Sequence, residues 1–157
     1  IVMLPHSLYQ MSRRTSADTV SSKPARCSKP VIAAGRGYCF GVGFELSLAC
    51  DFRLATETTL YALPEQKLGQ IPGSGGSARL QKMVGITRTK DIVMRSRRIT
   101  GRQAFEWGVA TDCLPDGELE KATDALDDQW AADITAKGGD GKKLLQESRD
   151  LIKKYTK

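Results

Sequence analysis

The stretch "PVIAAGRGYCFGVGFELSLACDF", residues 30–52, decides the fold class of this chain. Its first part, "VIAAG", is a short run of apolar residues ended by glycine, which is typical of a buried strand. Four glycines then fall within nine residues, and Phe44–Asp51 carries apolar residues on every face, as a buried helix does. A buried strand, a glycine turn and a buried helix in this order favour an α/β fold.

One carboxylate, Glu45, lies inside the apolar helix. An ionised glutamate is almost never fully buried without a partner, because leaving water costs several kcal/mol or more. The glycine turn puts the backbone N–H groups of residues 42–44 at the positive end of the expected helix, where anions bind and a forming oxyanion is stabilised. Glu45 is therefore either a surface or capping residue, the commoner role, or a carboxylate retained for chemistry.

Strands and helices alternate along the chain that follows. Two short strands are expected at 52–56 and 58–63, and Pro64 ends the second. A glycine-rich segment then becomes helical, with Gly85 as its expected stop. A capping box at Thr100–Gln103 predicts the start of another helix.

The last third continues the alternation. Gly108 stops the helix that the capping box begins, and 109–115 is expected to be extended. Helices are predicted at 118–137 and 142–157, joined by a glycine hinge. We therefore expect three parts: a loop or short helix with a linker at 1–29, an α/β core at 30–116 and a helical region at 117–157.

Composition indicates a globular protein. The chain has 157 residues, of which 40% are apolar and 27% charged, as in ordinary folded domains. Its apolar runs are far shorter than the roughly 18 residues of a membrane span, so no membrane partner is expected.

Cysteine and histidine usage argues against a metal site. Cys27, Cys39, Cys50 and Cys113 are widely spaced and His6 is the only histidine, so no metal is expected. Buried free thiols in a reducing, cytoplasmic location are the expected state. A nucleophile paired with histidine is not expected either, because His6 lies in a loose N-terminal segment.

The formal net charge of +6 is concentrated in residues 88–102 and 142–157. A solvated face is the first interpretation, a phosphate-bearing small molecule the second and nucleic acid a distant third. No known nucleic-acid-binding motif accompanies the charge, so no nucleic acid partner is expected.

Two further features concern the site. Gly73–Ala78 matches a G-x-G-x-x-A pattern, but no buried strand precedes it and no carboxylate follows about 20 residues later, so we interpret it as a turn that lets a helix pack closely. Glu65 follows a predicted strand end, 20 residues after Glu45. Each glutamate alone is more often a cap or surface residue, but together they could form an acid/base pair.

Residues 29–85, "KPVIAAGRGYCFGVGFELSLACDFRLATETTLYALPEQKLGQIPGSGGSARLQKMVG", strongly resemble the enoyl-CoA hydratase/isomerase (crotonase) superfamily, and residues 97–119, "RRITGRQAFEWGVATDCLPDGEL", resemble the stretch that follows in that family. The resemblance implies a β/α spiral of the ClpP/crotonase type and acyl-CoA thioester substrates. It also implies homotrimers or hexamers, and no cofactor apart from the coenzyme A that the substrate carries.

The resemblance also implies a site. The Val42 N–H matches one oxyanion donor, and Glu45 and Glu65 match the two carboxylates of hydratases. Gly41, Gly43 and Gly73 are expected to bind substrate. The implied activity is that of an enoyl-CoA hydratase, a lyase of fatty acid metabolism, and the alternatives are an enoyl-CoA isomerase or an acyl-CoA hydrolase.

Two departures from the family leave another alternative open. Val42 stands where a glycine is usual. The family's earlier half, with further strands and the second oxyanion N–H, has no match that we detect in residues 1–28. The expected spiral therefore lacks its N-terminal strands, and the alternative is a truncated, non-catalytic fragment that acts by association.

Overall fold

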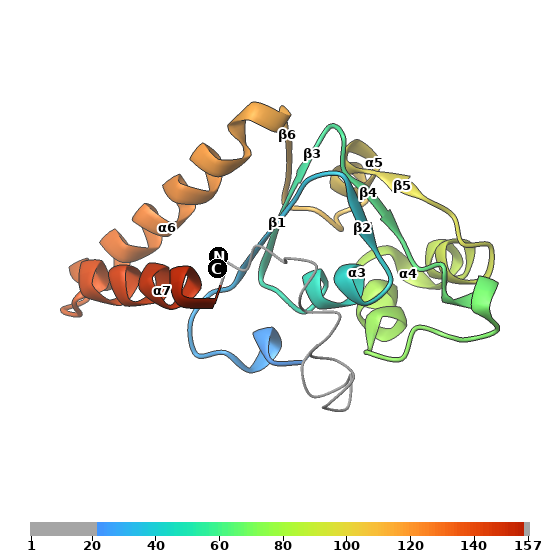
Figure 1. Cartoon of the computed structure of the whole chain (residues 1–157), viewed down its shortest axis with the longest axis horizontal. Coiled ribbons are helices and arrows are strands. Elements are labelled where there is room, and N and C mark those ends of the chain that lie inside the picture. Colours follow the sequence, from blue (N-terminus) through green and yellow to red (C-terminus); the bar gives the residue numbers. More distant parts are fainter. Residues whose placement is uncertain (1–21, 156–157) are drawn as a thin grey trace.

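The computed structural model describes residues 22–155, without the side chains of residues 148 and 151–155. The predictions for residues 1–21, which include His6, lie outside this part. The described chain is built on two three-stranded sheets with helices beside them (Figure 1), which confirms the predicted α/β class.

The first sheet has the order β1-β3-β6 and all its neighbours are parallel. Its strands are β1 (Ile32–Gly35), β3 (Phe52–Thr56) and β6 (Asp112–Leu114). Parallel neighbours need crossover connections. Those connections contain the second sheet and most of the helices.

The second sheet has the order β2-β4-β5. Here β2 (Tyr38–Phe40) is parallel to β4 (Leu60–Ala62), and β5 (Ile99–Thr100) is antiparallel to β4. Because β1 leads into β2 and β3 leads into β4, each turn of the chain adds one strand to each sheet. This repetition gives the chain the path of a spiral.

A helix follows each pair of strands. After β2 comes α3 (Val42–Ser47), and after β4 come the short 3₁₀ helix η2 (Glu65–Leu68) and the long helix α4 (Gly76–Met94). The predicted stop at Gly85 interrupts α4, since Gly85 has φ 78° and ψ 170°. The ends of β2 and β4 therefore lead directly into the segments that contain Glu45 and Glu65.

The predicted capping box is confirmed at the start of α5 (Gly101–Glu106). The Thr100 hydroxyl accepts a hydrogen bond from the Gln103 N–H at 3.1 Å, and the Gln103 side chain accepts one from the Thr100 N–H at 3.1 Å. Sequence patterns did not reveal β2, because its three residues lie between glycines and pair only with the distant β4.

The main core lies where α3, α4 and α5 meet β3, β4 and β5. The Phe44 ring packs on the Tyr61 ring with centroids 4.8 Å apart, and both side chains are fully buried. The buried members of this core are Phe44, Leu48, Ala55, Tyr61, Leu63, Leu80, Ile92, Ile99, Ala104, Val109 and Ala110. This packing explains why the helix around Glu45 is apolar on every face.

The C-terminal region is a helical hairpin that reaches away from the sheets (Figure 1). It contains α6 (Leu119–Ala136) and α7 (Gly141–Tyr155), and Leu119 packs on Ile32 and Leu54 of the first sheet. Two short 3₁₀ helices, η1 (Pro24–Arg26) and η3 (Asp116–Glu118), complete the described elements. None of the helices in residues 22–155 combines the length and apolarity needed to span a bilayer.

Candidate active site

Glu45 is buried, with 2% of its surface exposed, and it has two backbone partners. Its Oε1 accepts hydrogen bonds from the amides of Ser74 and Gly76, each at 2.9 Å. Gly76 is the first residue of α4, so this carboxylate lies at a helix N-terminus, where negative charge is favoured. The two charge-assisted hydrogen bonds stabilise a carboxylate that would otherwise be costly to bury.

The turn before α3 depends on Gly41. Its φ of 56° and ψ of −128° fall in a region that glycine adopts and other residues avoid. Its amide donates to the Ala62 carbonyl at 2.9 Å, and its own carbonyl accepts from the Glu45 amide at 3.0 Å. Gly41 therefore joins the start of α3 to the end of β4.

Glu65 is the first residue of η2, directly after Pro64. Its Oε2 is buried and has no hydrogen-bond partner among the described residues. Burial raises the pKa of this carboxyl above its ordinary value; a hydrogen bond from its own backbone opposes the rise, and the charge of Glu45 adds to it. This carboxyl therefore releases its proton at a higher pH than an ordinary glutamate does.

Glu45 and Glu65 both lie beside Gly41, Glu65 through its carboxyl and Glu45 through its backbone amide. A Cβ atom added to Gly41 would lie 2.9 Å from Oε1 of Glu65, while the Gly41 carbonyl bonds the Glu45 amide. Val42, the next residue, begins α3; the first amides of a helix have no intrahelical acceptor, and Gly41 provides no side-chain cap. The structure thus brings together four of the six predicted site residues.

Gly43 and Gly73, the other two predicted site residues, have open space where a side chain would be. A Cβ at Gly43 would meet no atom within 4 Å, and a Cβ at Gly73 would meet only the Ile71 carbonyl, at 4.0 Å. Gly73 is exposed, whereas Gly43 is half-buried beside Val42. Their predicted role in binding substrate stays a prediction.

Sequence reasoning missed the donors of Ser74 and Gly76. The interpretation of "GSGG" as a turn for close packing is correct in part, because a Cβ on Gly76 would lie 2.5 Å from the Glu45 Cγ. The closely packed group is the carboxylate itself. A signal was present: a buried glutamate needs donors, and a glycine turn ahead of a helix supplies free amides.

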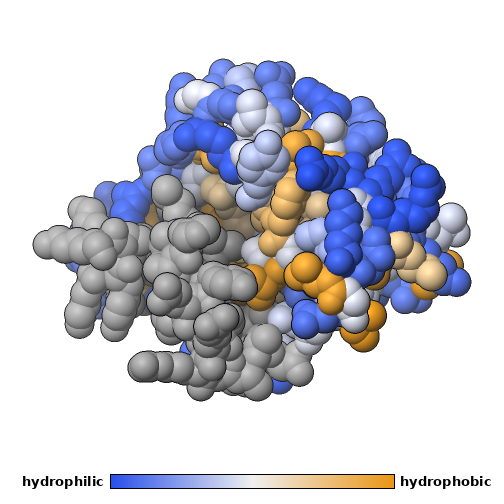
Figure 2. All heavy atoms as spheres, turned by 45° about the vertical axis from the view of Figure 1, so that its right-hand side comes forward, coloured by the Kyte–Doolittle hydropathy of each residue, from blue (hydrophilic) through white to orange (hydrophobic). Residues whose placement is uncertain are grey.

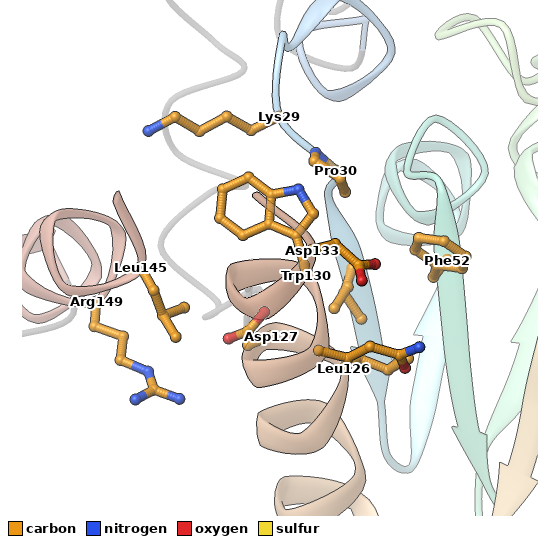
Figure 3. A pocket seen from close by; sticks show the side chains of 11 residues that line it. Lys29, Pro30, Phe52, Leu126, Asp127, Trp130, Asp133, Leu145 and Arg149 are labelled. Atoms are coloured by element: carbon orange, nitrogen blue, oxygen red, sulfur yellow. The ribbon is translucent and has the colours of Figure 1, made fainter. Parts of the chain in front are cut away.

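A separate cavity of about 350 Å³ lies between the first sheet and the α6–α7 hairpin (Figure 3). Apolar side chains such as Phe52 and Trp130 line it, with Asp127, Asp133 and Arg149 among them. None of the predicted site residues borders this cavity. Its location therefore gives no support to a role in the chemistry of Glu45 and Glu65.

Cys39 and Cys50 are poorly suited to nucleophilic chemistry. All four cysteines are free, and Cys50 and Cys113 are buried. Burial raises the pKa of Cys39 to about 12 and that of Cys50 to about 11, so both remain neutral thiols at physiological pH. Within residues 22–155, no group of three histidine, cysteine or acidic side chains is arranged to hold a metal ion.

Part of the basic surface contacts its own chain. Arg95 and Arg97 pair with Asp91 at 2.9 and 2.7 Å, and the guanidinium groups of Arg88 and Arg97 lie 4.6 and 5.4 Å from the Trp107 ring centroid. Such contacts support the interpretation of this cluster as a solvated face. The face in Figure 2 shows hydrophilic residues with some apolar residues between them.

Comparisons with known proteins agree with the resemblance in the sequence motifs. A family model described as enoyl-CoA hydratase/isomerase matches residues 6–153, which is more of the chain than the resemblance in its sequence motifs covers. A carnitinyl-CoA dehydratase of Salmonella arizonae is 40% identical over 124 residues, covering 79% of this chain and 48% of that protein. The chain thus spans about half the length of the curated relatives it matches.

Two crystal structures show the same fold. An enoyl-CoA hydratase of Bacillus anthracis matches 79% of this chain and 48% of its own, with a TM-score of 0.69 and 34% identity. An enoyl-CoA hydratase of Mycobacterium avium subsp. paratuberculosis matches 72% of this chain and 47% of its own, with a TM-score of 0.69 and 30% identity. These likenesses confirm the expected crotonase-like β/α spiral.

Proposed function

Because this chain belongs to the enoyl-CoA hydratase/isomerase family, we propose that Glu45 and Glu65 form an acid/base pair that adds water to a 2-enoyl-CoA thioester, or removes it from the 3-hydroxyacyl product. The observation that carries this proposal is that the Glu65 carboxyl and the start of the helix that bears Glu45 both lie at Gly41, and that the charge of Glu45 acts on the Glu65 carboxyl. The two carboxyl groups differ in surroundings, as two groups with opposite proton-transfer roles should.

Glu45 is suited to hold and deprotonate the water. Its Oε1 is fixed by hydrogen bonds from the amides of Ser74 and Gly76. Its Oε2 accepts no hydrogen bond from the described residues, so it remains for a water molecule. A fixed carboxylate with one open oxygen can orient water and accept its proton as the water attacks the β-carbon.

Glu65 is suited to deliver a proton. Its raised pKa keeps a fraction of the group protonated at higher pH than an ordinary glutamate, because burial disfavours the charge. In hydration, Glu65 donates this proton to the α-carbon while Glu45 takes one from water. Glu65 thus loses one proton and Glu45 gains one. Before the next turnover, the two carboxyls must return to their starting protonation states by exchanging a proton with solvent or with each other.

The amide of Val42 is the proposed donor to the thioester oxygen. Attack at the β-carbon moves electrons onto this oxygen, and a fixed N–H donor stabilises the resulting enolate by interactions that strengthen in the transition state. Val42 is the first residue of α3, directly after Gly41, and its amide has no side-chain cap. Losing such a donor costs on the order of 10²–10³ in rate.

The proposed substrate class is acyl-CoA, without a further cofactor. The relative from Salmonella arizonae carries the name carnitinyl-CoA dehydratase, and the crystal structures are of enoyl-CoA hydratases. We therefore propose hydratase or dehydratase chemistry in place of isomerisation or thioester hydrolysis. A cytoplasmic homotrimer or hexamer is the assembly proposed for the whole protein.

A turnover assay tests the proposal. Loss of the conjugated enoyl-thioester absorbance of crotonyl-CoA is followed with the chain and with E45Q, E65Q and E57Q, and carnitinyl-CoA is tested for dehydration. Glu57 is exposed and follows β3 of the first sheet, where its amide bonds the Leu114 carbonyl of β6, so E57Q is the matched control. We expect E45Q and E65Q each to lower the rate by on the order of 10²–10⁴ and E57Q to leave it unchanged. Equal rates for all three variants would contradict the proposal.

A second candidate is acyl-CoA binding without turnover. The observation that favours it is the single matched oxyanion donor, Val42, where the resemblance calls for two. Saturable binding of crotonyl-CoA without any loss of the enoyl absorbance would support this candidate over the hydratase.

A further inference from the structure

Ser96 has an unusual backbone conformation. Its φ is 51°, and no other non-glycine residue in the described part has a positive φ. It follows Arg95, the C-cap of α4, at the position where glycine commonly adopts this conformation. A serine there carries a steric cost of the kind that recurs at functional sites.

The Ser96 side chain contacts the element that bears Glu65. Its hydroxyl accepts a hydrogen bond from the Gln66 side-chain amide at 3.1 Å, and Ser96 itself is 7% exposed. Gln66 is the residue after Glu65 in η2. Ser96 therefore bonds the residue next to Glu65, the proposed acid.

The short helix η2 has few other attachments. Its backbone hydrogen bonds join residues 64–70 to one another, and no residue of η2 is buried. Leu68 has 78% of its surface exposed. Among the described residues, no other side-chain hydrogen bond connects η2 to another element.

We propose that Ser96 is a positioning residue for the Glu65 carboxyl: its left-handed backbone presents the hydroxyl to Gln66, and the Gln66–Ser96 hydrogen bond fixes η2 against the end of α4. This inference rests on the proposed function for its catalytic meaning. The steric cost at Ser96 is accepted because a glycine would relieve it but would provide no hydroxyl.

Two substitutions separate backbone strain from the hydroxyl. Both S96G and S96A lack the hydroxyl, but only S96G relieves the backbone. We expect S96G to melt about 2–4 °C above S96A. We also expect both variants to speed hydrogen exchange of the Gly69 and Gln70 amides of this segment, to a similar extent, on the order of 2- to 10-fold. If Ser96 only stabilises the fold, exchange follows stability and S96G protects these amides better than S96A.

Gln66 supplies the partner test. Q66A should speed exchange of the same two amides as S96A does, and the double variant S96A/Q66A should add little to either, because one bond is removed in each case. Independent, additive effects of the two substitutions would overturn the proposal. So would unchanged exchange in Q66A.

Turnover measurements test whether the Gln66–Ser96 hydrogen bond affects the chemistry of Glu65. With crotonyl-CoA, S96G, S96A and Q66A should each lower kcat by about 3- to 10-fold with little change in KM, because misplacing an acid affects the proton transfer more than binding. If E65Q also slows turnover but these variants do not, the positioning role is wrong and the proposed function stands. If E65Q does not slow turnover, the proposed function is wrong. In that case, or if the chain shows no turnover at all, the hydrogen-exchange experiment alone tests whether the Gln66–Ser96 hydrogen bond fixes η2.

Discussion

Oε1 of Glu45 lies 2.9 Å from the amide nitrogen of Gly76, the first residue of α4. This contact explains how a carboxylate persists in an apolar helix, because the carboxylate caps another helix. The contact also holds Glu45, the proposed base, by backbone amides. Backbone amides cannot rotate away as a side chain can.

The contact between Glu45 and Gly76 leaves no room for a methyl group. In G76A, the new Cβ would lie 2.5 Å from the Glu45 Cγ, so the carboxylate must move. We expect G76A to lower turnover by about 10²-fold or more, because a shift of about 1 Å in a reacting group has that effect. The same overpacking should lower the free energy of unfolding, so the measurements are the rate of crotonyl-CoA hydration and denaturant unfolding.

Gly73 offers the matched control for Gly76. It lies in the same loop, but a Cβ there meets nothing closer than 4.0 Å. G73A should leave the free energy of unfolding near its original value. A G73A variant as unstable as G76A would show that the loop, and not the contact with Glu45, is responsible.

Gly41 should tolerate no side chain. Its φ of 56° and ψ of −128° disfavour alanine, and a Cβ would approach the Glu65 Oε1 to 2.9 Å. We expect G41A to destabilise the protein by about 1–3 kcal/mol from backbone strain and to shift the pKa of Glu65. Denaturant unfolding and carboxyl NMR titration measure the two effects, and a stable G41A with an unchanged Glu65 titration would contradict the geometry.

Glu65 should weaken the fold as pH rises. Its folded pKa is raised by burial, so the folded state holds the proton more tightly than the unfolded state. Its contribution to stability is then fully present below the ordinary glutamate pKa of about 4.3 and is lost as pH rises through the folded pKa.

E65Q removes this pH-dependent contribution. We expect the stability difference between E65Q and the unmodified chain to shift in favour of E65Q as pH rises from 4 to 8, measured by urea unfolding. A difference that stays constant across this range would mean that the pKa of Glu65 is not raised.

Arg53 should be a major source of stability. It is 7% exposed, and its side chain donates to the carbonyls of Ser47, Cys50 and Val109 at 3.1, 2.5 and 2.6 Å. R53M leaves these carbonyls without that donor, so we expect a loss of about 2–4 kcal/mol in the free energy of unfolding.

Arg95 provides the comparison for Arg53. Its side chain is 79% exposed and pairs with Asp91 on the surface, so R95M should cost less than about 1 kcal/mol. Similar losses for R53M and R95M would contradict the role assigned to the buried guanidinium.

Local sequence patterns predicted much of the fold. The apolar run at β1, the stop at Gly85 and the capping box at Thr100 are all signals carried by a few adjacent residues, and the structure contains each of them. The strands β2 and β5 escaped prediction, because they contain three and two residues and exist through pairing with β4. Pairing of distant segments is not visible in local composition.

The site was predicted in the same uneven way. Glu45 attracted attention as a charge in an apolar helix, and the resemblance added Glu65 and Val42. The donors of Ser74 and Gly76 could not be assigned, because their partner is 29 and 31 residues away in the chain. The hydrogen bond between Gln66 and Ser96 joins residues 30 positions apart, and no local sequence pattern indicated it.

The most direct test of the central claim is hydration of crotonyl-CoA in D₂O, followed by NMR of the product. Our account predicts one deuterium at the α-carbon and a hydroxyl at the β-carbon, formed on the order of 10²–10⁴ times more slowly by E45Q and by E65Q than by the unmodified chain. Formation of this product at an unchanged rate by either variant would contradict the account.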